Sequence, residues 1–171
     1  MSACEMNFQN PPKGKPSWLS LSQAVFNLQA NRWDDQHCNG GLRWQIFTWN
    51  RGYDYKNSIS NGGFFQLAAR LARYTANDTY AQWADKTWDW MAGSPLFTPD
   101  QDYAVYDGAQ IAVNCTNPTR IQWTYNVGTM LMGAANMYNY VRSSFHCALV
   151  PSLTCRQRQM DLQNGGAASK V

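Results

Sequence analysis

The segment NGGFFQLAARLARY, residues 61–74, decides the fold class of this chain. Its apolar side chains recur every three to four residues, and two alanines, Ala69 and Ala72, keep the segment slim. The polar residues 57–62 lead into it, so we predict a helix over 63–74. The stripe that we expect to be buried consists of Phe64, Leu67, Ala68 and Leu71.

Apolar residues at helical spacing also occur in other parts of the chain. Ser17 is a good capping residue before one such segment, and loops that contain proline or glycine separate the segments from one another. We predict further helices over 18–32, 79–91 and 125–140.

Two of the predicted helices begin alike. One follows Asn61-Gly62 and the other follows Asn126-Val127-Gly128, and both carry alanines where neighbouring helices would crowd. Helices packed around a common axis need such small side chains, so this repeat predicts an all-α fold built as a toroid of helical hairpins. The N-termini of the inner helices would then ring one mouth of the toroid. Independent capping by asparagine is the alternative explanation of the repeat.

Length and composition indicate one globular domain. The 171 residues can form one core, and 44% are hydrophobic while 15% are charged, which excludes a disordered chain. The helical periodicity fails after Tyr140, so we expect the domain to cover residues 1–140 and residues 141–171 to form an irregular tail. The formal charge of +3 comes from scattered basic residues, which argues against a nucleic-acid or membrane-surface partner.

Aromatic residues are frequent, with 8 tryptophans and 9 tyrosines in a chain of low charge. Flat aromatic side chains suit a groove that stacks against apolar faces, and sugar rings offer such faces. Large aromatic side chains also fill hydrophobic cores, because each one buries a large area. Composition alone leaves both interpretations open.

The cysteines give no metal-binding pattern. The chain has no CxxC pair and no histidine at zinc spacing, so we expect neither a metal nor another cofactor. Two sequons, at Asn77 and Asn114, would accept glycans in the secretory route. The first residues, 1–5, are typical of the end of a helix rather than of a signal peptide. The apolar runs are too short to span a bilayer.

A set of motifs along the chain carries a family resemblance. They are GGLRWQIF at 40–47, YKNSISNG at 55–62, FFQLAARLARY at 64–74, WADKTWDW at 83–90, VYDG at 105–108, NCT at 114–116 and WTYN at 123–126. In this spacing they resemble glycoside hydrolase family 76, the fungal and bacterial endo-α-1,6-mannanases and their cell-wall relatives. The similarity extends from residue 1 to about residue 140.

The resemblance implies a partial (α/α)6 toroid with a sugar groove across one mouth. It implies action on α-1,6-linked mannose chains, of α-mannan or of a glycolipid anchor, by hydrolysis or by transfer. It also implies a secreted protein, or one at the cell wall or plasma membrane. Cys38 and Cys115 lie in matched loops, and we expect them to form a disulfide under oxidising conditions.

The catalytic residues of the family are missing from this chain. The chemistry there rests on two neighbouring aspartates in an Asn-Asp-Asp motif, one as nucleophile and one as acid/base. The only adjacent pair here is Asp34-Asp35, whose place at the end of a predicted helix indicates a solvated turn. We therefore assign no catalytic residue and expect the chain to be inactive. The alternatives are a non-catalytic mannan-binding module and a fragment that does not fold.

Candidate sugar-contacting residues lie near helix starts and in the aromatic motifs. A tryptophan at such a place stacks on a sugar face or packs between helices, and an asparagine bonds sugar hydroxyls or caps a helix. Asp107 accepts hydrogen bonds from a sugar or forms a turn with Gly108. Trp123 is a second candidate for stacking. The residues that we expect to line the site are Trp44, Asn57, Asn61, Asp107, Tyr125 and Asn126.

Overall fold

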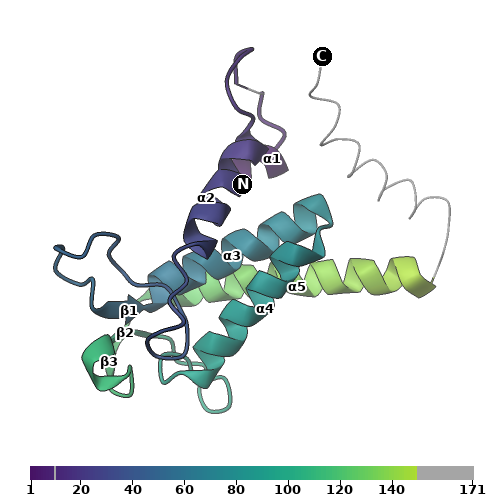
Figure 1. Cartoon of the computed structure of the whole chain (residues 1–171). Coiled ribbons are helices and arrows are strands. Elements are labelled where there is room, and N and C mark those ends of the chain that lie inside the picture. Colours follow the sequence, from purple (N-terminus) through teal and green to yellow (C-terminus); the bar gives the residue numbers. More distant parts are fainter. Residues whose placement is uncertain (10, 150–171) are drawn as a thin grey trace.

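Helices dominate the structure, a computed structural model that describes residues 1–9 and 11–149 (Figure 1). Its elements, in chain order, are α1 (Ser2–Glu5), α2 (Trp18–Ala30), β1 (Tyr55–Asn57), α3 (Ser58–Thr75), α4 (Asp78–Gly93), β2 (Tyr106–Gln110), the short 3-10 helix η1 (Ile111–Val113), β3 (Pro118–Gln122) and α5 (Thr124–Leu149).

Helices α3 and α4 form a hairpin. The side chain of Asn57 accepts a hydrogen bond from the Ser60 N–H and starts α3, which ends where Ala76 adopts a left-handed conformation with φ 53°. Asn77 follows at once and caps α4, its side-chain oxygen accepting from the Thr79 N–H at 2.9 Å. The predicted helices at 63–74 and 79–91 are confirmed, and α3 begins earlier because Asn57 caps it.

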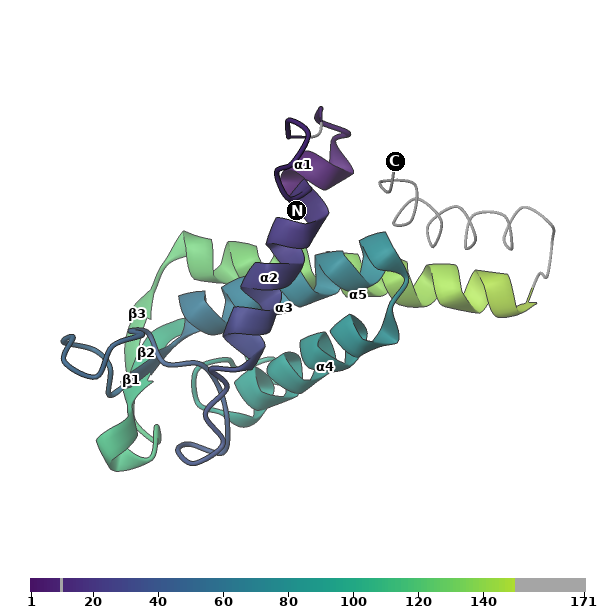
Figure 2. The same ribbon diagram turned by 45° about the horizontal axis from the view of Figure 1, so that its top comes forward.

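Helix α5 lies along α3, and both helices begin at the sheet (Figures 1 and 2). The two can approach closely because glycines stand at their contact: a Cβ on Gly62 would collide with the Thr129 side chain, and one on Gly133 with the Phe65 ring. The glycine of the sequence repeat, Gly128, faces open space instead. Of the repeat's glycines, Gly62 therefore makes room for the contact between the two helices, while on α5 Gly133 does so in place of Gly128.

The prediction of an all-α fold is wrong in one respect. Strands β1, β2 and β3 form a three-stranded antiparallel sheet in that order, with Lys56 opposite Ala109 and Gly108 opposite Thr119. Strands of three to five residues are too short to show an alternating pattern. The helices of the described region form the α3–α4 hairpin with α2 and α5 beside it and do not close a ring, so the (α/α)6 toroid stays a prediction.

Helix α5 continues nine residues beyond the predicted end at Tyr140, to Leu149. The sequence from 141 to 149 has neither glycine nor proline to stop a helix. The loss of the apolar period after Tyr140 therefore did not mark the end of the helix. The remainder of the predicted tail, residues 150–171, lies outside the described residues, as does Cys155. None of the described helices is long and apolar enough to cross a membrane.

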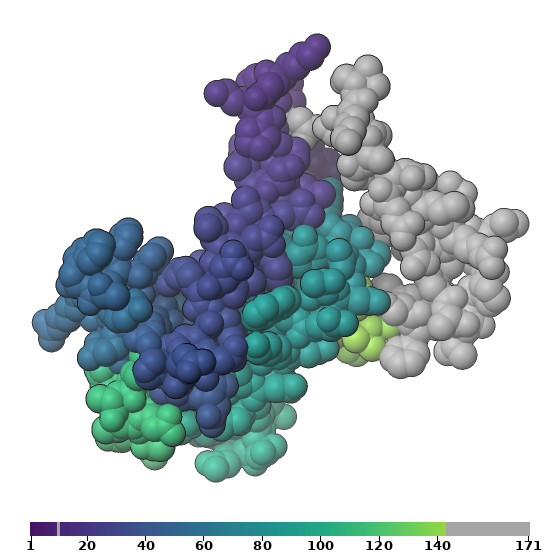
Figure 3. Space-filling view, viewed as in Figure 1, coloured from purple at the N-terminus to yellow at the C-terminus, as the bar shows by residue number. Residues whose placement is uncertain are grey.

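Aromatic residues occur both in the core and on the surface. Phe26 of α2 is buried and packs against Phe64 and Tyr80, with ring centroids 5.3 and 4.7 Å apart, and so ties α2 to the hairpin. Other aromatic side chains stay exposed near the sheet and in the lobe of residues 43–53, which is blue in Figure 3. The exposed group is the part available for binding.

Candidate functional site

Tyr55, the first residue of β1, connects the lobe to the sheet. Its hydroxyl donates a hydrogen bond to the Asp107 carboxylate on β2, with 3.0 Å between the oxygens. The Trp44 and Tyr55 rings meet edge to face at a centroid distance of 6.3 Å, and the backbone N–H of Trp44 donates to the Tyr55 backbone carbonyl. Two of the predicted site residues, Trp44 and Asp107, are thus brought together through a tyrosine between them.

Glycines provide the space for both aromatic rings. A Cβ on Gly108 would lie 2.5 Å from the Tyr55 ring and 2.6 Å from the Lys56 carbonyl oxygen. Gly52, with φ +96°, leaves the space over which the Trp44 ring lies. The rings of Trp44 and Tyr55 therefore lie directly against the backbone of Gly52 and Gly108, where no larger side chain would fit.

Trp123 and Tyr125 form an exposed aromatic pair at the start of α5. Their rings are stacked, with centroids 6.0 Å apart and planes 8° apart, and 45% and 48% of their surfaces are exposed.

Burial raises the pKa of Tyr55. The hydrogen bond to Asp107 and the neighbouring Tyr125 also raise this pKa, whereas a hydrogen bond with Thr119 lowers it. Tyr55 is thus a neutral hydrogen-bond donor at physiological pH.

The Tyr55 cluster, as we name it, comprises Trp44, Tyr55, Asp107, Trp123 and Tyr125. It combines exposed aromatic faces with a carboxylate and a phenol that are only partly buried. This combination can stack against the flat face of a ligand and form hydrogen bonds with its hydroxyl groups.

The predicted asparagines are buried. Asn61 is fully buried; its side chain accepts from the Leu42 N–H at 2.8 Å and donates to the carbonyls of Leu42 and Asn57. Asn57 is 3% exposed and caps α3. Asn57 thus caps α3, and Asn61 anchors residue 42 to the start of α3.

Asn126 is also fully buried, in the first turn of α5. Neither its side-chain oxygen nor its nitrogen has a hydrogen-bond partner among the described residues. An unpaired buried amide costs free energy, so it requires a partner outside those residues or an ordered water.

Asp34 does not lie in a solvated turn, and that prediction is wrong. Its side chain is 12% exposed and pairs with Arg43 at 2.8 Å and with Lys56 at 3.5 Å. Burial acts to raise the pKa of Asp34, but the His37 hydrogen bond and the charges of Lys56 and Arg43 outweigh it, so the pKa is lowered. Asp35 points elsewhere, accepting from the Trp33 indole at 2.8 Å.

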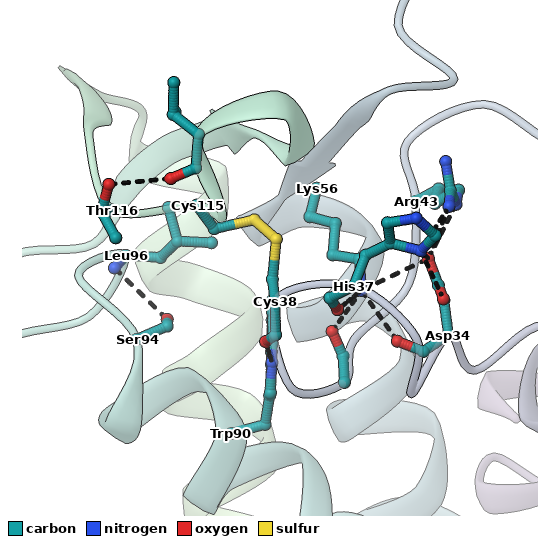
Figure 4. Close-up of a disulfide and its surroundings, with 12 residues drawn as sticks. Asp34, His37, Cys38, Arg43, Lys56, Trp90, Ser94, Leu96, Cys115 and Thr116 are labelled. Carbon is teal, nitrogen blue, oxygen red and sulfur yellow. Dashed lines mark hydrogen bonds and ion pairs between the residues drawn. A yellow bond between two sulfur atoms is a disulfide. The ribbon is translucent and has the colours of Figure 1, made fainter.

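The side chain of Lys56 reaches into the loop of residues 34–41 and holds it together (Figure 4). Its side chain is fully buried, and the ammonium donates to the carbonyls of Asp34 at 2.9 Å and of His37 and Gly40 at 2.5 Å each. Burial lowers the pKa of Lys56 to about 8, against the opposing effect of Asp34. Lys56 therefore holds the backbone of residues 34–40 in place.

A disulfide joins the same loop to the turn after η1. Cys38 and Cys115 are bonded, and the Trp90 indole donates to the Cys38 carbonyl at 2.9 Å (Figure 4). Beside the disulfide lies a cleft of about 490 Å³, and none of the six predicted site residues lines it. Among the described residues, no group of three or more His, Cys, Asp or Glu is placed to hold a metal ion.

Comparison with known proteins assigns the chain to a family. The model of glycosyl hydrolase family 76 matches residues 1–154. The chain belongs to glycosyl hydrolase family 76. It is 60% identical over 140 residues to mannan endo-1,6-alpha-mannosidase DCW1 of Candida albicans, an alignment that covers 82% of this chain and 31% of that protein. Identity to mannan endo-1,6-alpha-mannosidase DFG5 of Saccharomyces cerevisiae is 54% over 139 residues, covering 81% of this chain and 30% of that protein.

Solved structures of the family superpose on the chain. Dfg5 from Chaetomium thermophilum, in complex with glucosamine, matches with a TM-score of 0.77 and 46% identity over 94% of this chain and 37% of that one. An inactive variant of an α-1,6-mannanase of Salegentibacter, with two consecutive aspartates replaced, matches in fold with a TM-score of 0.59 and 24% identity over 70% of this chain and 34% of that one. The chain spans about a third of the length of the family 76 relatives it matches.

Sequence reasoning missed Tyr55 and Lys56. Tyr55 precedes the polar lead into α3, and a three-residue strand gave no pattern to show that its ring would lie over Gly108. A buried lysine carries no sequence signal at all, because lysine is rarely buried and the loop carbonyls that bind it belong to residues 16 to 22 positions earlier.

Proposed function

We propose that this chain supplies the mannan-binding surface of a family 76 mannan endo-1,6-α-mannosidase and does not hydrolyse mannan by itself. The observations that carry the proposal are the exposed, parallel Trp123–Tyr125 pair and the hydrogen-bonded Tyr55–Asp107 pair. The register of β2 and β3, with Tyr106 opposite Gln122, brings Asp107 and Trp123 to the same end of the sheet. Two family members with this activity in their names share more than half of the aligned residues with this chain.

The chemistry of the cluster suits a mannose chain. A sugar ring presents an apolar face of C–H groups, and the exposed faces of Trp123 and Tyr125 match it. The Asp107 carboxylate can accept hydrogen bonds from sugar hydroxyls in addition to the one from Tyr55. An uncharged sugar has no need of a cationic partner, which agrees with the composition of the Tyr55 cluster.

The aspartates of the chain support the absence of turnover. Retaining glycosidases need two carboxyl groups about 5 Å apart on either side of the scissile bond. Asp34 is ion-paired with Arg43 and Lys56, while Asp35 accepts from Trp33, so the two carboxylates serve different partners. The printed sequence holds no Asn-Asp-Asp motif. In the Salegentibacter mannanase, a variant with two consecutive aspartates replaced is inactive.

The cellular setting is part of the same proposal. A disulfide between Cys38 and Cys115 requires an oxidising environment. Fungal relatives carry mannan endo-1,6-alpha-mannosidase in their names. We therefore propose that the chain enters the secretory route and binds α-1,6-mannan of the fungal cell wall or mannose-containing anchor glycans.

The experiment measures binding and turnover on the same protein sample. Isothermal titration with α-1,6-mannotriose is expected to show binding that Trp123→Ala weakens, while a reducing-end assay on α-1,6-mannan shows no product. A Val113→Ala variant, exposed on η1, is the control and should bind like the parent. Failure of the parent to bind, with circular dichroism showing a folded protein, contradicts the binding proposal. Release of reducing ends that Asp34→Ala or Asp35→Ala abolishes contradicts the absence of turnover, and a sample without helical signal supports the non-folding alternative.

A further inference from the structure

The two sequons of the chain stand in different structural settings. Asn77 is the N-cap of α4, whose first two residues are Asp78 and Thr79, and Asn114-Cys115-Thr116 lies between η1 and β3. Both asparagines are exposed. An N-glycan is attached to the asparagine amide, and the transfer also requires the threonine hydroxyl two residues later. The availability of these two groups decides whether a sequon in a folded chain is an acceptor.

The Asn77 sequon is open in the folded protein. The Asn77 side-chain oxygen accepts from the Thr79 N–H at 2.9 Å, a turn that brings the amide and residue 79 together. Within the described part of the chain, the Thr79 hydroxyl donates to no protein atom, and the Asn77 amide nitrogen makes no hydrogen bond to the protein. Both groups that the transfer needs are therefore free on the surface.

The Asn114 sequon is closed by the disulfide and by its own turn. Cys115 is 3% exposed and bonded to Cys38, and its N–H donates to the Gln110 carbonyl at 3.0 Å. The Thr116 N–H and hydroxyl both donate to the Val113 carbonyl, at 3.2 and 2.8 Å (Figure 4). The threonine hydroxyl that transfer requires is thus engaged, and the residue between the two sequon groups is fixed in the interior.

We propose that Asn77 is an N-glycosylation site of the folded protein and that Asn114 accepts a glycan only while Cys115 is still a thiol. The donor is a polyprenyl-diphosphate-linked oligosaccharide. The Asn77 amide nitrogen forms a bond to the anomeric carbon of the first sugar, the bond from that carbon to the diphosphate breaks, and the amide proton passes to a base of the transferase. At residue 114 the same transfer competes with thiol–disulfide exchange between Cys38, Cys115 and an oxidised dithiol oxidoreductase.

The glycan at Asn77 would not obstruct the Tyr55 cluster. Asn77 lies at the far end of α3 from Asn57, and the 18 residues of that helix span about 27 Å. Asn114, by contrast, follows η1 on the sheet side of the molecule. The disulfide therefore protects the sheet side from a glycan while the opposite end accepts one. This inference requires entry into the secretory route and does not depend on mannan binding.

A reconstituted transfer reaction tests the proposal on the whole chain. Unglycosylated, oxidised protein from a bacterial periplasm is incubated with a eukaryotic oligosaccharyltransferase and a lipid-linked oligosaccharide, with and without dithiothreitol. Peptide mass spectrometry then gives the occupancy of each site. We expect Asn77 to be modified in both samples and Asn114 only in the reduced one. Circular dichroism of the reduced sample shows whether the helices persist.

Each other outcome overturns part of the proposal. If Asn77 stays unmodified in the oxidised protein, it is not a glycosylation site of the folded chain. The variant Thr79→Ala, which lacks the sequon, is the negative control. If Asn114 is modified equally with and without reductant, or in neither sample, the disulfide does not control its glycosylation. In secreting yeast, Cys38→Ser should raise Asn114 occupancy several-fold over the parent, whereas Cys4→Ser, which removes a buried free thiol and leaves the disulfide, should not.

Discussion

The Tyr55 hydroxyl donates a hydrogen bond to the Asp107 carboxylate across 3.0 Å, although 52 residues separate the two in sequence. Strands β1 and β2 bring them together, and Gly108 leaves the space in which the Tyr55 ring lies. The pair fixes the direction of a carboxylate on β2, the central strand of the sheet. Any sugar that binds Asp107 meets a carboxylate already held in one orientation.

The variant Tyr55→Phe removes this hydrogen bond and keeps the ring. We expect the affinity for α-1,6-mannotriose to fall about fivefold, because a single hydrogen bond contributes about 1 kcal/mol. Isothermal titration measures the change. Tyr138→Phe, on the exposed side of α5, is the matched control and should leave the affinity unchanged. Equal affinities for Tyr55→Phe and the parent would show that the orientation of Asp107 has no part in binding.

The variant Gly108→Ala places a methyl group 2.5 Å from the Tyr55 ring and 2.6 Å from the Lys56 carbonyl. We expect it to lower the free energy of unfolding by about 1–3 kcal/mol and to weaken mannotriose binding, because the ring must move. Urea unfolding followed by circular dichroism measures the first effect. Gly63→Ala, in α3 with open space around it, should instead be neutral or stabilise by up to about 1 kcal/mol. Similar stability of both variants would mean that the Tyr55 ring is not confined.

The variant Lys56→Met removes the donor of hydrogen bonds to three loop carbonyl groups. We expect a loss of roughly 2–4 kcal/mol in the free energy of unfolding at pH 7, since those carbonyls and Asp34 lose their partner. Lys86→Met, at a lysine whose side chain is 45% exposed, is the control and should change stability by less than about 1 kcal/mol. Loss of the same size in both variants would contradict the role given to Lys56.

Lys56 also predicts a pH dependence. Its pKa falls from the ordinary 10.5 to about 8 on folding, so between these values the unfolded chain binds more protons than the folded one. The free energy of unfolding of the parent should therefore rise with pH from about 8 to 10.5 relative to Lys56→Met, by roughly 3 kcal/mol in total. Urea unfolding at several pH values measures the difference between the two curves. Parallel curves over this range would show that the pKa of Lys56 does not change on folding.

The sequence was informative where structure follows from local pattern. The helix over 63–74 and the caps Ser17 and Asn57 are local features, and the structure contains them. Of the predicted stripe, Phe64, Ala68 and Leu71 are buried and Leu67 is partly buried. The sheet, the burial of Lys56 and the place of Tyr55 depend on partners far along the chain, which a pattern over neighbouring residues does not contain. The family resemblance supplied what periodicity could not, and the comparisons confirm it.

The disulfide between Cys38 and Cys115 closes a loop of 77 residues. We expect reduction to lower the free energy of unfolding by about 2–4 kcal/mol, mainly because the unfolded chain gains freedom. Thermal unfolding with and without reductant measures this loss. Mass spectrometry of non-reduced peptides locates the bond, and two alkylatable thiols at these positions in secreted protein would contradict it.

Helices α2 and α5 each expose an apolar stripe, and this predicts self-association of the isolated chain. Leu28 and Leu131 are 65% and 68% exposed, and the relatives that the chain matches are about three times as long, so they have further chain to cover such faces. We expect the parent to sediment as oligomers and Leu131→Glu to shift it toward the monomer, because a charge on the stripe cannot be buried without cost. Val113→Glu, an equal change at an exposed apolar residue of η1, should leave the distribution unchanged. A parent that stays monomeric at every concentration in analytical ultracentrifugation would show that these faces do not associate.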